Sequence, residues 1–326
     1  CLTFVLESCR ASGVSAYSRD HRFVVFWARG DLPFLCAYGD LLFNREANDT
    51  IAEFVRKKIR DIVKDPETAD LLCPDNVFGC KRLCVDIDYF ATYNQPHVNL
   101  IDVSKKPIER FTKKGIVTND IEYEFDSIVC ATGFAAMTGS FDKIKITGRD
   151  GLTLKEKWSA GPRTYLGLSS NGFPNLFMIT GPGSPSVLAS MIQAIEQHVD
   201  WIADCIGHLR DVGASTIEAK IHDENDWVDH VNDVSQVSLR STCSSCYVGA
   251  NIPGRPKGFM PYIGGFPIYV DKCNSIMMGG YEGFIMAGSE KPTTPPQVRC
   301  TERWHVELDM EVISPAAIAA KQVPIV

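Results

Sequence analysis

Two adjacent cations, Lys81 and Arg82, stand in the segment "FGCKRLCVDIDYF" directly after Gly79 and Cys80. The β-branched and aromatic run behind them predicts a strand, in which neighbouring side chains point to opposite faces. The two charges could therefore serve different targets. Taken alone, an adjacent Lys and Arg are more often a solvated basic patch.

A second segment, "FMITGPGSPSVL" (residues 177–188), could be a turn that holds a nucleotide pyrophosphate. A dinucleotide turn needs three glycines for close backbone approach and an acidic residue about 20 positions further on, after the next strand. Here the third glycine position holds Ser186, prolines occupy 182 and 185, and the acidic residue at that distance, Asp204, lies within the same helical pattern. The segment therefore does not match the dinucleotide fingerprint.

The same turn predicts the start of a helix over about 185–209, with Ser184 as its N-cap and Pro185 at its first position. Its amides would then face whatever lies over the turn, a position that favours a negative or carbonyl-bearing group. A well-capped core helix explains the pattern equally well. The apolar positions that repeat at helical spacing are Ile192, Ile195, Val199, Ile202 and Ile206.

Twelve cysteines are spread over the chain at irregular spacing, so we expect most of them to be reduced thiols in the core. Cys243 and Cys246 form one Cys-Ser-Ser-Cys, but no second ligand pair follows at zinc spacing. The glycines and prolines after this pair predict a loop. We therefore predict no metal site.

Helices and strands elsewhere follow from periodicity and turn residues. Asn48 or Asp49 could cap a helix whose apolar positions run from Ile51 to Val63, and a short helix is expected from Pro66. The runs "RLCVDIDYF", "VNLIDV" and "EYEFDSIVCATGF" predict short strands, so residues 80–134 are expected to be strand-rich. Near the carboxyl end, "RWHVELDMEV" alternates strictly, which predicts one amphipathic strand unless the alternation is chance.

Composition limits the classes of function. With 326 residues and 45% hydrophobic content, the chain can bury a large core, and its length suggests roughly two domains. The net charge of −7 argues against nucleic acid and anionic membranes as partners. No apolar run approaches the ~20 residues of a membrane span. We expect a cytoplasmic protein, and a first residue other than Met suggests a fragment or a processed product.

Four long motifs carry a resemblance to a known family: "DSIVCATGF", "KWSAGPRTYLGLSSNGFPNLFMITGPGSPSVLASMIQAIEQHVDW", "YVGANIPGRPKGFMPYIGG" and "GYEGF". Together they resemble the carboxyl-terminal half of Baeyer-Villiger monooxygenases of the phenylacetone and cyclohexanone monooxygenase type. The resemblance implies an α/β flavoprotein with two dinucleotide-binding domains. It also implies FAD and NADPH as cofactors and a reaction that inserts one atom of O2 beside a ketone carbonyl.

The resemblance also implies roles for single residues. Lys81 matches the lysine that contacts the 2'-phosphate of NADPH. Arg82 matches the arginine that stabilises the flavin peroxide and the anionic adduct formed when it attacks the ketone. The turn Gly181–Ser184 would lie beside the flavin ring, and Met191 near the flavin and substrate, although Met191 could equally be a core residue. The cofactor-binding residues implied in this way are Lys81, Thr132, Gly133, Phe134, Gly181, Pro182, Gly183, Ser184, Met191 and Cys246.

The chain departs from the family in two ways. Cys246 stands where the family has a tryptophan that organises a loop over nicotinamide, and cysteine is only a weak donor with less surface. No Gly-x-Gly-x-x-Gly occurs in the sequence, and the family's fingerprint histidine motif and the aspartate paired with the active-site arginine are absent as well.

The resemblance predicts a partial fold in four segments. Residues 1–75 are expected to be a helical insertion of the NADPH domain, 76–134 the end of that domain, 135–286 the carboxyl-terminal part of the FAD domain, and 287–326 a tail without counterpart. Two hypotheses follow: a partial copy of a ketone monooxygenase, or a non-catalytic remnant that acts at most as a binding module. An upstream open frame encoding two glycine fingerprints would favour the enzyme.

Overall fold

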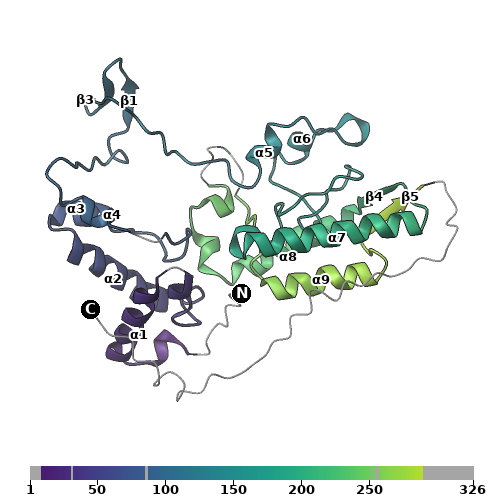
Figure 1. Ribbon diagram of the computed structural model, residues 1–326, viewed down its shortest axis with the longest axis horizontal. Helices are drawn as coiled ribbons and strands as arrows, with labels where there is room; N and C mark the ends of the chain where they lie inside the picture. The colour runs from purple at the N-terminus through teal and green to yellow at the C-terminus, as the bar shows by residue number, and fades with distance from the viewer. Residues whose placement is uncertain are drawn as a thin grey trace.

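The computed structural model describes residues 9–30, 32–84, 87–250, 252, 254 and 257–288. Its first part is helical and is drawn in purple and blue in Figure 1. Ser15 caps the first helix by accepting the N–H of Ser18. Asp65 caps the third, where Pro66 takes the first helical position as predicted. The helices of this part are α1 (Ala16–Arg29), α2 (Arg45–Ile62), α3 (Pro66–Leu72) and α4 (Tyr89–Thr92).

Helix α2 begins one turn earlier than the sequence predicted. Its N-cap is Asn44, whose Oδ1 accepts the N–H of Ala47 at 2.9 Å. The prediction that Asn48 or Asp49 caps this helix is therefore wrong. Asn48 is instead fully buried on the inner face of the helix, where its amide bonds to backbone outside α2. A polar side chain on the buried face of a helix needs such partners, because an unpaired buried amide is costly.

Aromatic side chains fill the space between α1 and α2. Phe23 is fully buried, and its ring centroid lies 5.7 Å from that of Tyr38 and 5.5 Å from that of Phe54. Phe34 joins the same cluster and meets Phe78 edge to face at 5.4 Å. Large rings in such contacts hold a small helical core together. The loop that carries Phe78 is therefore packed against this core.

The strands of this region lie at other positions than predicted. A three-stranded antiparallel sheet is formed by β1 (Ile108–Phe111), β2 (Gly115–Thr118) and β3 (Ile121–Glu124). It lies at the top left of Figure 1, at the end of a long irregular connection. The prediction of strands over "RLCVDIDYF" and "VNLIDV" is wrong for their described residues, and only Glu122–Glu124 of the third run lie in a strand. A strand needs a partner for its backbone groups, and no described strand lies beside these runs.

The carboxyl-terminal part contains the largest core. Trp201, Trp227 and Tyr269 are buried within it, and β4 and β5 pair antiparallel at its edge. Helices α7 and α9 run side by side in this part (Figure 1), and Trp227 of α8 packs near Tyr269 of α9, with ring centroids 6.2 Å apart. Its elements are α5 (Gly139–Asp142), α6 (Leu154–Lys157), α7 (Met191–Asp211), β4 (Thr216–Ala219), α8 (Ile221–Gln236), α9 (Phe266–Met278) and β5 (Phe284–Ala287).

Helix α7 starts later than predicted. It begins at Met191 after Ser190, and a 3-10 turn, η4 (Ser186–Leu188), precedes it. Ala189 is extended, with φ −122° and ψ −179°, which separates the two helical segments. Ser184 is therefore not the N-cap, and Pro185 is not the first residue of this helix. The predicted end near Leu209 agrees with the observed end at Asp211.

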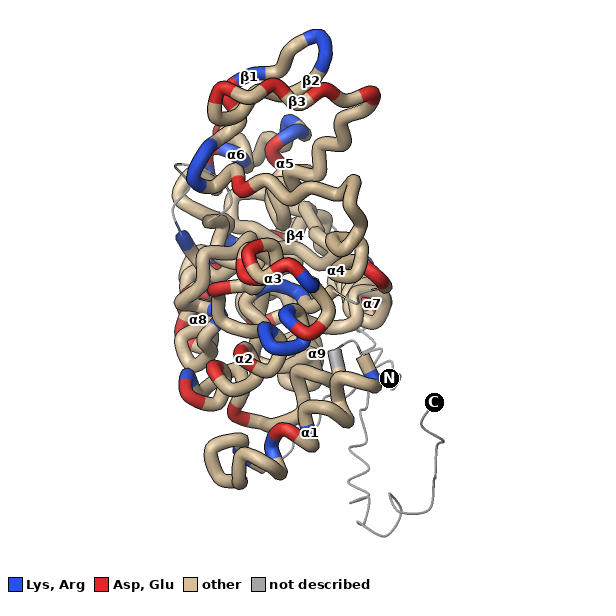
Figure 2. The backbone as a smooth tube through the Cα atoms, turned by 90° about the vertical axis from the view of Figure 1, so that its left-hand side faces the viewer, with Lys and Arg blue, Asp and Glu red and all other residues tan. Residues whose placement is uncertain are grey.

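Positions of both charge signs are distributed along the described chain. Figure 2 shows Lys and Arg positions interspersed with Asp and Glu positions along the backbone. No described helix is long and apolar enough to cross a membrane. The predicted strand "RWHVELDMEV" and nearly all of the tail 287–326 lie outside the described residues.

Candidate functional site

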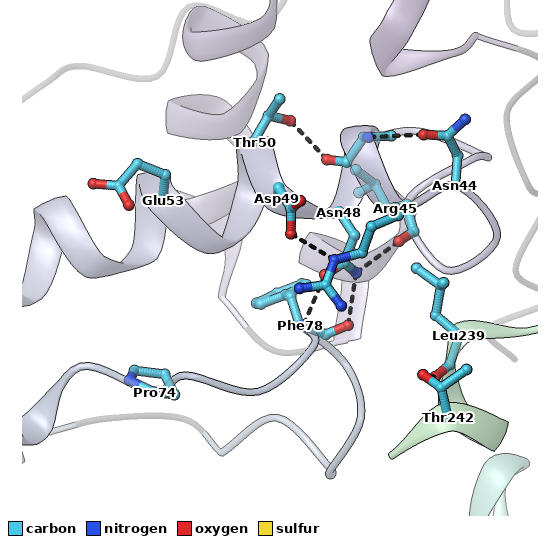
Figure 3. Close-up of polar contacts among 12 residues, drawn as sticks. Asn44, Arg45, Asn48, Asp49, Thr50, Glu53, Pro74, Phe78, Leu239 and Thr242 are labelled. Atoms are coloured by element: carbon cyan, nitrogen blue, oxygen red, sulfur yellow. Dashed lines mark hydrogen bonds and ion pairs between the residues drawn. The ribbon is translucent and has the colours of Figure 1, made fainter.

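The loop that carries Lys81 and Arg82 is held by helix α2. Asn48 Nδ2 donates to the carbonyl oxygens of Leu41 at 2.8 Å and Phe78 at 3.0 Å, and its Oδ1 accepts the N–H of Phe78 at 2.9 Å (Figure 3). Asn48 thus bonds both backbone groups of Phe78, only three residues before Lys81. The conformation of this loop is consequently set by a buried side chain, not by a strand.

A second restraint comes from the segment after helix α8. The 3-10 turn η5 (Leu239–Thr242) carries Arg240, whose Nε donates to the carbonyl oxygen of Gly79 at 2.9 Å. Burial lowers the pKa of Arg240 from its ordinary value, but a guanidinium remains charged in proteins. Gly79 has φ +77°, and a Cβ there would approach Leu42 Cδ2 to 2.7 Å. Only glycine fits this position without strain.

A disulfide joins the same two segments. Cys80 and Cys243 are bonded, with their Cα atoms 6.0 Å apart, and they connect residues 163 positions apart in the sequence. The expectation that most cysteines are reduced is confirmed for eight of the described ones, but it is wrong for this pair. Among the described free thiols only Cys205 and Cys273 are buried, so for these residues the expectation of core positions is mostly wrong.

Lys81 and Arg82 are both exposed, and they directly follow Cys80, which is bonded to Cys243 three residues before Cys246. Cys246 begins the 3-10 turn η6 (Cys246–Val248), as the predicted loop allows. Burial raises the pKa of Tyr247, and the cations of Arg240 and Arg82 oppose this rise. Arg82 therefore lies within electrostatic reach of Tyr247, directly beside Cys246. The structure thus brings Arg82 toward the loop that begins with Cys246, from a distant part of the sequence.

The turn Gly181–Ser184 is buried and packed against protein. A Cβ on Gly181 would lie 2.5 Å from the carbonyl oxygen of Gly167, and Ser184 is fully buried. The N–H of Gly183 donates to the carbonyl of Met260 at 2.7 Å, and that of Ser184 donates to Gly181. The glycines thus permit two backbone segments to touch. The amides of Gly183 and Ser184 are engaged by protein carbonyls.

The turn and the Cys246 loop are directly connected. The N–H of Met260 donates to the carbonyl of Tyr247 at 2.8 Å, while the carbonyl of Met260 accepts from Gly183. Leu188, in η4, packs against Tyr247 and Val248. Met260 therefore connects the turn Gly181–Ser184 to the loop of Cys246. The resemblance to the family had placed both in one site.

Unlike the buried turn Gly181–Ser184, the predicted residues Thr132, Gly133 and Phe134 lie at the surface. All three are exposed, and the side chain of Phe134 is 91% exposed. The connection to the turn comes slightly later, where Ser186 Oγ lies 3.6 Å from the sulfur of Met137. Met191 is the first residue of α7 and is partly exposed, at 37%. The segment around Met137 thus approaches η4, which directly precedes the amino-terminal end of α7.

His198, in α7, holds the residue that precedes the turn Gly181–Ser184. Its Nδ1 accepts the N–H of Thr180 at 2.8 Å, and Thr180 has φ +53° directly before Gly181. Because Nδ1 accepts, the neutral ring carries its proton on Nε2, which lies 2.9 Å from the hydroxyl of Tyr269. That hydroxyl donates to the carbonyl of Leu166 at 2.7 Å. Burial lowers the pKa of His198 to about 4.

The low pKa of His198 predicts a loss of stability in mild acid. An unfolded histidine has its ordinary pKa of 6.5, so between pH 6.5 and 4 the unfolded chain binds the extra proton. The contribution of neutral His198 to the free energy of unfolding is fully present above pH 6.5. It falls by on the order of 3 kcal/mol as the pH decreases toward 4. Urea unfolding of the chain across this range measures the slope.

A matched pair of variants assigns this slope. His198→Gln is neutral at every pH and should remove most of the slope, whereas His97→Gln, at an exposed position, should retain it. Equal slopes for the two variants would show that other groups cause the acid sensitivity.

Two hollows of the described surface lie away from these residues. One is lined by Ile146–Arg149 and Phe173–Leu176, and another by residues of the sheet around Lys114 and Glu124–Ser127. Neither contains a predicted site residue. Among the described residues no group of His, Cys, Asp and Glu could hold a metal ion.

Sequence reasoning missed three positioning residues. Asn48 and His198 stand on the apolar faces of α2 and α7, and a lone polar residue on such a face is a signal that periodicity could have exposed. Arg240 carries no such signal, because its role depends on a loop about 160 residues away.

Comparisons with known proteins agree with this geometry. A steroid monooxygenase whose solved structure is bound to NADP has a TM-score of 0.80 and 44% identity, and it covers 87% of this chain and 54% of that chain. A Baeyer-Villiger monooxygenase from Pseudooceanicola batsensis is 34% identical over 279 residues, which is 84% of this chain and 50% of the relative. The chain belongs to the Baeyer-Villiger monooxygenase family.

Other relatives of the family include a phenazine N-monooxygenase from Lysobacter antibioticus, which is 36% identical over 84% of this chain and 52% of the relative. No family model matches the sequence. The chain spans about half the length of the curated relatives it matches. The predicted resemblance and the partial two-dinucleotide-domain flavoprotein fold are confirmed, and the half length is consistent with the predicted carboxyl-terminal half.

Proposed function

We propose that this chain forms the carboxyl-terminal half of an FAD- and NADPH-dependent Baeyer-Villiger monooxygenase, which converts a ketone and O2 to an ester or lactone. The observation that carries this proposal is the 44% identity to a steroid monooxygenase bound to NADP, at a TM-score of 0.80. The same proposal includes a cytoplasmic location without nucleic-acid partners. It also includes the division of the chain into the four segments 1–75, 76–134, 135–286 and 287–326.

The residues present fit the nicotinamide nucleotide better than the flavin pyrophosphate. Lys81 and Arg82 are exposed cations, which suit a phosphate and a developing oxyanion. The buried hydroxyl of Ser245, next to Cys246, has no hydrogen-bond partner among the described residues and could serve the same ligand. The amides of Gly183 and Ser184 are already engaged, so we propose that Gly181–Ser184 shapes the cofactor site by packing.

FAD and NADPH, when bound, would supply the electrons and the oxygen transfer. The contribution of this chain to the reaction would be electrostatic. Arg82 would hold a positive charge where negative charge develops on the substrate oxygen, and Lys81 would select the phosphate-bearing nucleotide. Asn48, Arg240 and the Cys80–Cys243 bond would keep both cations in place without reorganisation during the reaction, which is how preorganised groups lower a barrier.

The function is tested by joining the amino-terminal half of the steroid monooxygenase to this chain and supplying a ketone, NADPH and O2. Formation of ester with matching NADPH consumption supports the proposal. Oxidation of a ring nitrogen in a phenazine instead of the ketone would keep the oxygenase and change its substrate class. A fused protein that binds flavin but oxygenates neither substrate would favour the non-catalytic remnant.

The isolated chain should not retain FAD. The sequence contains no glycine fingerprint, and the turn amides of Gly183 and Ser184 are occupied by protein. Purification of the chain followed by a visible spectrum measures this directly, with the fused protein as the positive control. Stoichiometric flavin absorbance of the isolated chain would show that this half holds the nucleotide by itself.

Lys81→Ala in the fused protein should raise the apparent NADPH constant about 10- to 100-fold, the worth of one charged hydrogen bond to phosphate. NADH use should change little, since NADH lacks the 2'-phosphate. Lys113→Ala, at an exposed position of the sheet region, is the control. Steady-state kinetics with both nucleotides measure the difference. An equal loss with NADPH and NADH would make Lys81 a structural residue.

A further inference from the structure

A disulfide lies in a small junction between the helical part of the chain and the carboxyl-terminal part. Cys80, in the loop after the helical core, is bonded to Cys243, which directly follows η5. The N–H of Leu239 (Figure 3) donates to the carbonyl oxygen of Leu42 at 2.9 Å, and Arg240 donates to the residue before Cys80. The junction thus combines one covalent bond with hydrogen bonds to backbone carbonyls.

The apolar part of this junction is small. Among the described residues only Val77 and Leu239 pack with the two sulfurs, whereas a large cluster lies on each side. A region with few buried apolar contacts opens locally at low free energy. The bond joins residues 163 positions apart, so it removes many open conformations. It therefore decides whether the loop of Cys80 stays on the segment of Cys243.

Cations and further thiols accompany the bond. Lys81 and Arg82 directly follow Cys80 and are exposed, and a neighbouring cation favours the thiolate, which is the reactive form of cysteine. The same two segments carry two free thiols, since Cys84 is exposed and Cys246 is half-buried. Four of the chain's twelve cysteines are thus gathered in two short segments.

The proposed cytoplasmic location favours a reversible bond. Thiols are kept reduced in the cytosol, and the disulfides that form there are usually transient, catalytic or redox-sensing. Hydrogen peroxide oxidises thiolates, and it is the product expected in place of ester when oxygen transfer to the ketone fails. An oxidant for this pair would therefore arise at the enzyme itself.

We propose that Cys80 and Cys243 form a peroxide-responsive thiol pair, whose oxidation holds the loop of Lys81 and Arg82 on residues 239–248. The Cys80 thiolate attacks one oxygen of hydrogen peroxide and becomes a sulfenic acid, with release of hydroxide. The Cys243 thiol attacks this sulfur, so the S–S bond forms as the S–O bond breaks and water leaves. Two thiols and one peroxide thus give one disulfide and two waters.

The source of the peroxide rests on the proposed function, but the pair and its effect on the loop do not. In the proposed enzyme, the oxidised pair keeps Arg82 in place for the ketone step and thereby lowers further release of peroxide. A dithiol returns the pair to its reduced state by thiol–disulfide exchange.

Oxidation of the isolated chain tests the pair. The chain is reduced with dithiothreitol, the reductant is removed, and one equivalent of hydrogen peroxide is added. We expect the Cys80–Cys243 crosslink as the main disulfide in peptide mapping by mass spectrometry, and its loss when dithiothreitol is returned. Hydrogen exchange of residues 76–84 and 239–248 should be about 30- to 1,000-fold slower in the oxidised chain, since the bond closes a long loop. Exchange within α7 should not change.

Three substitutions assign the effect to this pair. Cys80→Ser and Cys243→Ser should each abolish the peroxide response and keep the fast exchange of the reduced chain. Cys84→Ser removes an exposed free thiol of the same segment and should retain the full response. The comparison between the reduced and the oxidised unmodified chain needs no substitution, so it decides the matter even where a serine variant does not fold.

The fused protein shows the effect on the reaction. Cys80→Ser represents the thiol state there, because peroxide cannot form the bond. It should release more peroxide for each NADPH consumed than the oxidised unmodified protein, whereas Cys84→Ser should release no more.

Four results would overturn the proposal. They are a main crosslink between other cysteines, equal exchange in the two redox states, a bond that dithiothreitol reduces only after unfolding in urea, and equal peroxide release by Cys80→Ser and the unmodified protein where ester forms. A reversible crosslink that slows exchange, in a fused protein that forms no ester, would retain the thiol pair and reject the catalytic function. The two proposals can thus fail separately.

Discussion

Arg82→Ala in the fused protein should reduce ester formation by about 10²- to 10³-fold, the cost of removing one preorganised donor from a developing oxyanion. Arg82 is exposed at the end of a loop held by Asn48 and Arg240, so its own side chain contributes little to core packing. NADPH should still be consumed, and hydrogen peroxide should appear in place of ester. One assay that follows NADPH, peroxide and ester measures this change in coupling.

Two controls separate charge from structure in this variant. Arg82→Lys keeps the charge without the planar fork and should recover part of the ester formation. Arg110→Ala removes an exposed arginine of β1 and should leave coupling unchanged. Ester formation by Arg82→Ala at the coupling of the unmodified fused protein would remove Arg82 from the mechanism, and Lys81 and Arg82 would then be a solvated basic patch.

Lys157→Met should destabilise the isolated chain by roughly 3–5 kcal/mol, the cost of leaving one partner of a buried ion pair alone. Lys157 Nζ lies 2.8 Å from Oε2 and 3.0 Å from Oε1 of Glu224, and the Glu224 side chain is fully buried. Ser170 Oγ and the N–H of Asn171 also donate to Oε1, so Glu224 organises the backbone around residue 170. Urea unfolding at pH 7 measures the loss.

The exposed pair Lys114–Glu124 supplies the comparison, because both of its side chains are more than half exposed. Lys114→Met should cost no more than about 1 kcal/mol. Adding Glu224→Gln to Lys157→Met should restore part of the stability, since the charge left alone is then removed. A loss for Lys157→Met no larger than for Lys114→Met would show that Glu224 remains hydrated in the folded chain.

The sequence by itself determined the local features whose causes are local. Pro66 begins α3, and the apolar periodicity of α7 predicts its end to within a few residues, because capping and helical spacing involve neighbours in the chain. Motif content identified the family, which the comparisons confirm. The net charge and the absence of a glycine fingerprint are likewise properties of the sequence alone.

Only the tertiary structure decided the positions that depend on distant partners. The runs "RLCVDIDYF" and "VNLIDV" have strand composition but form no described strand, since pairing needs a neighbour that composition does not contain. Ser184 looks like a cap but is buried in a turn that packs on Gly167, and Asn48 looks like a cap but binds Phe78. The approach of Arg82 to the loop of Tyr247 depends on Arg240, which holds Gly79, and on the Cys80–Cys243 bond. These contacts join residues about 160 positions apart, and hydrogen bonds and packing over such separations leave no periodic pattern in a sequence.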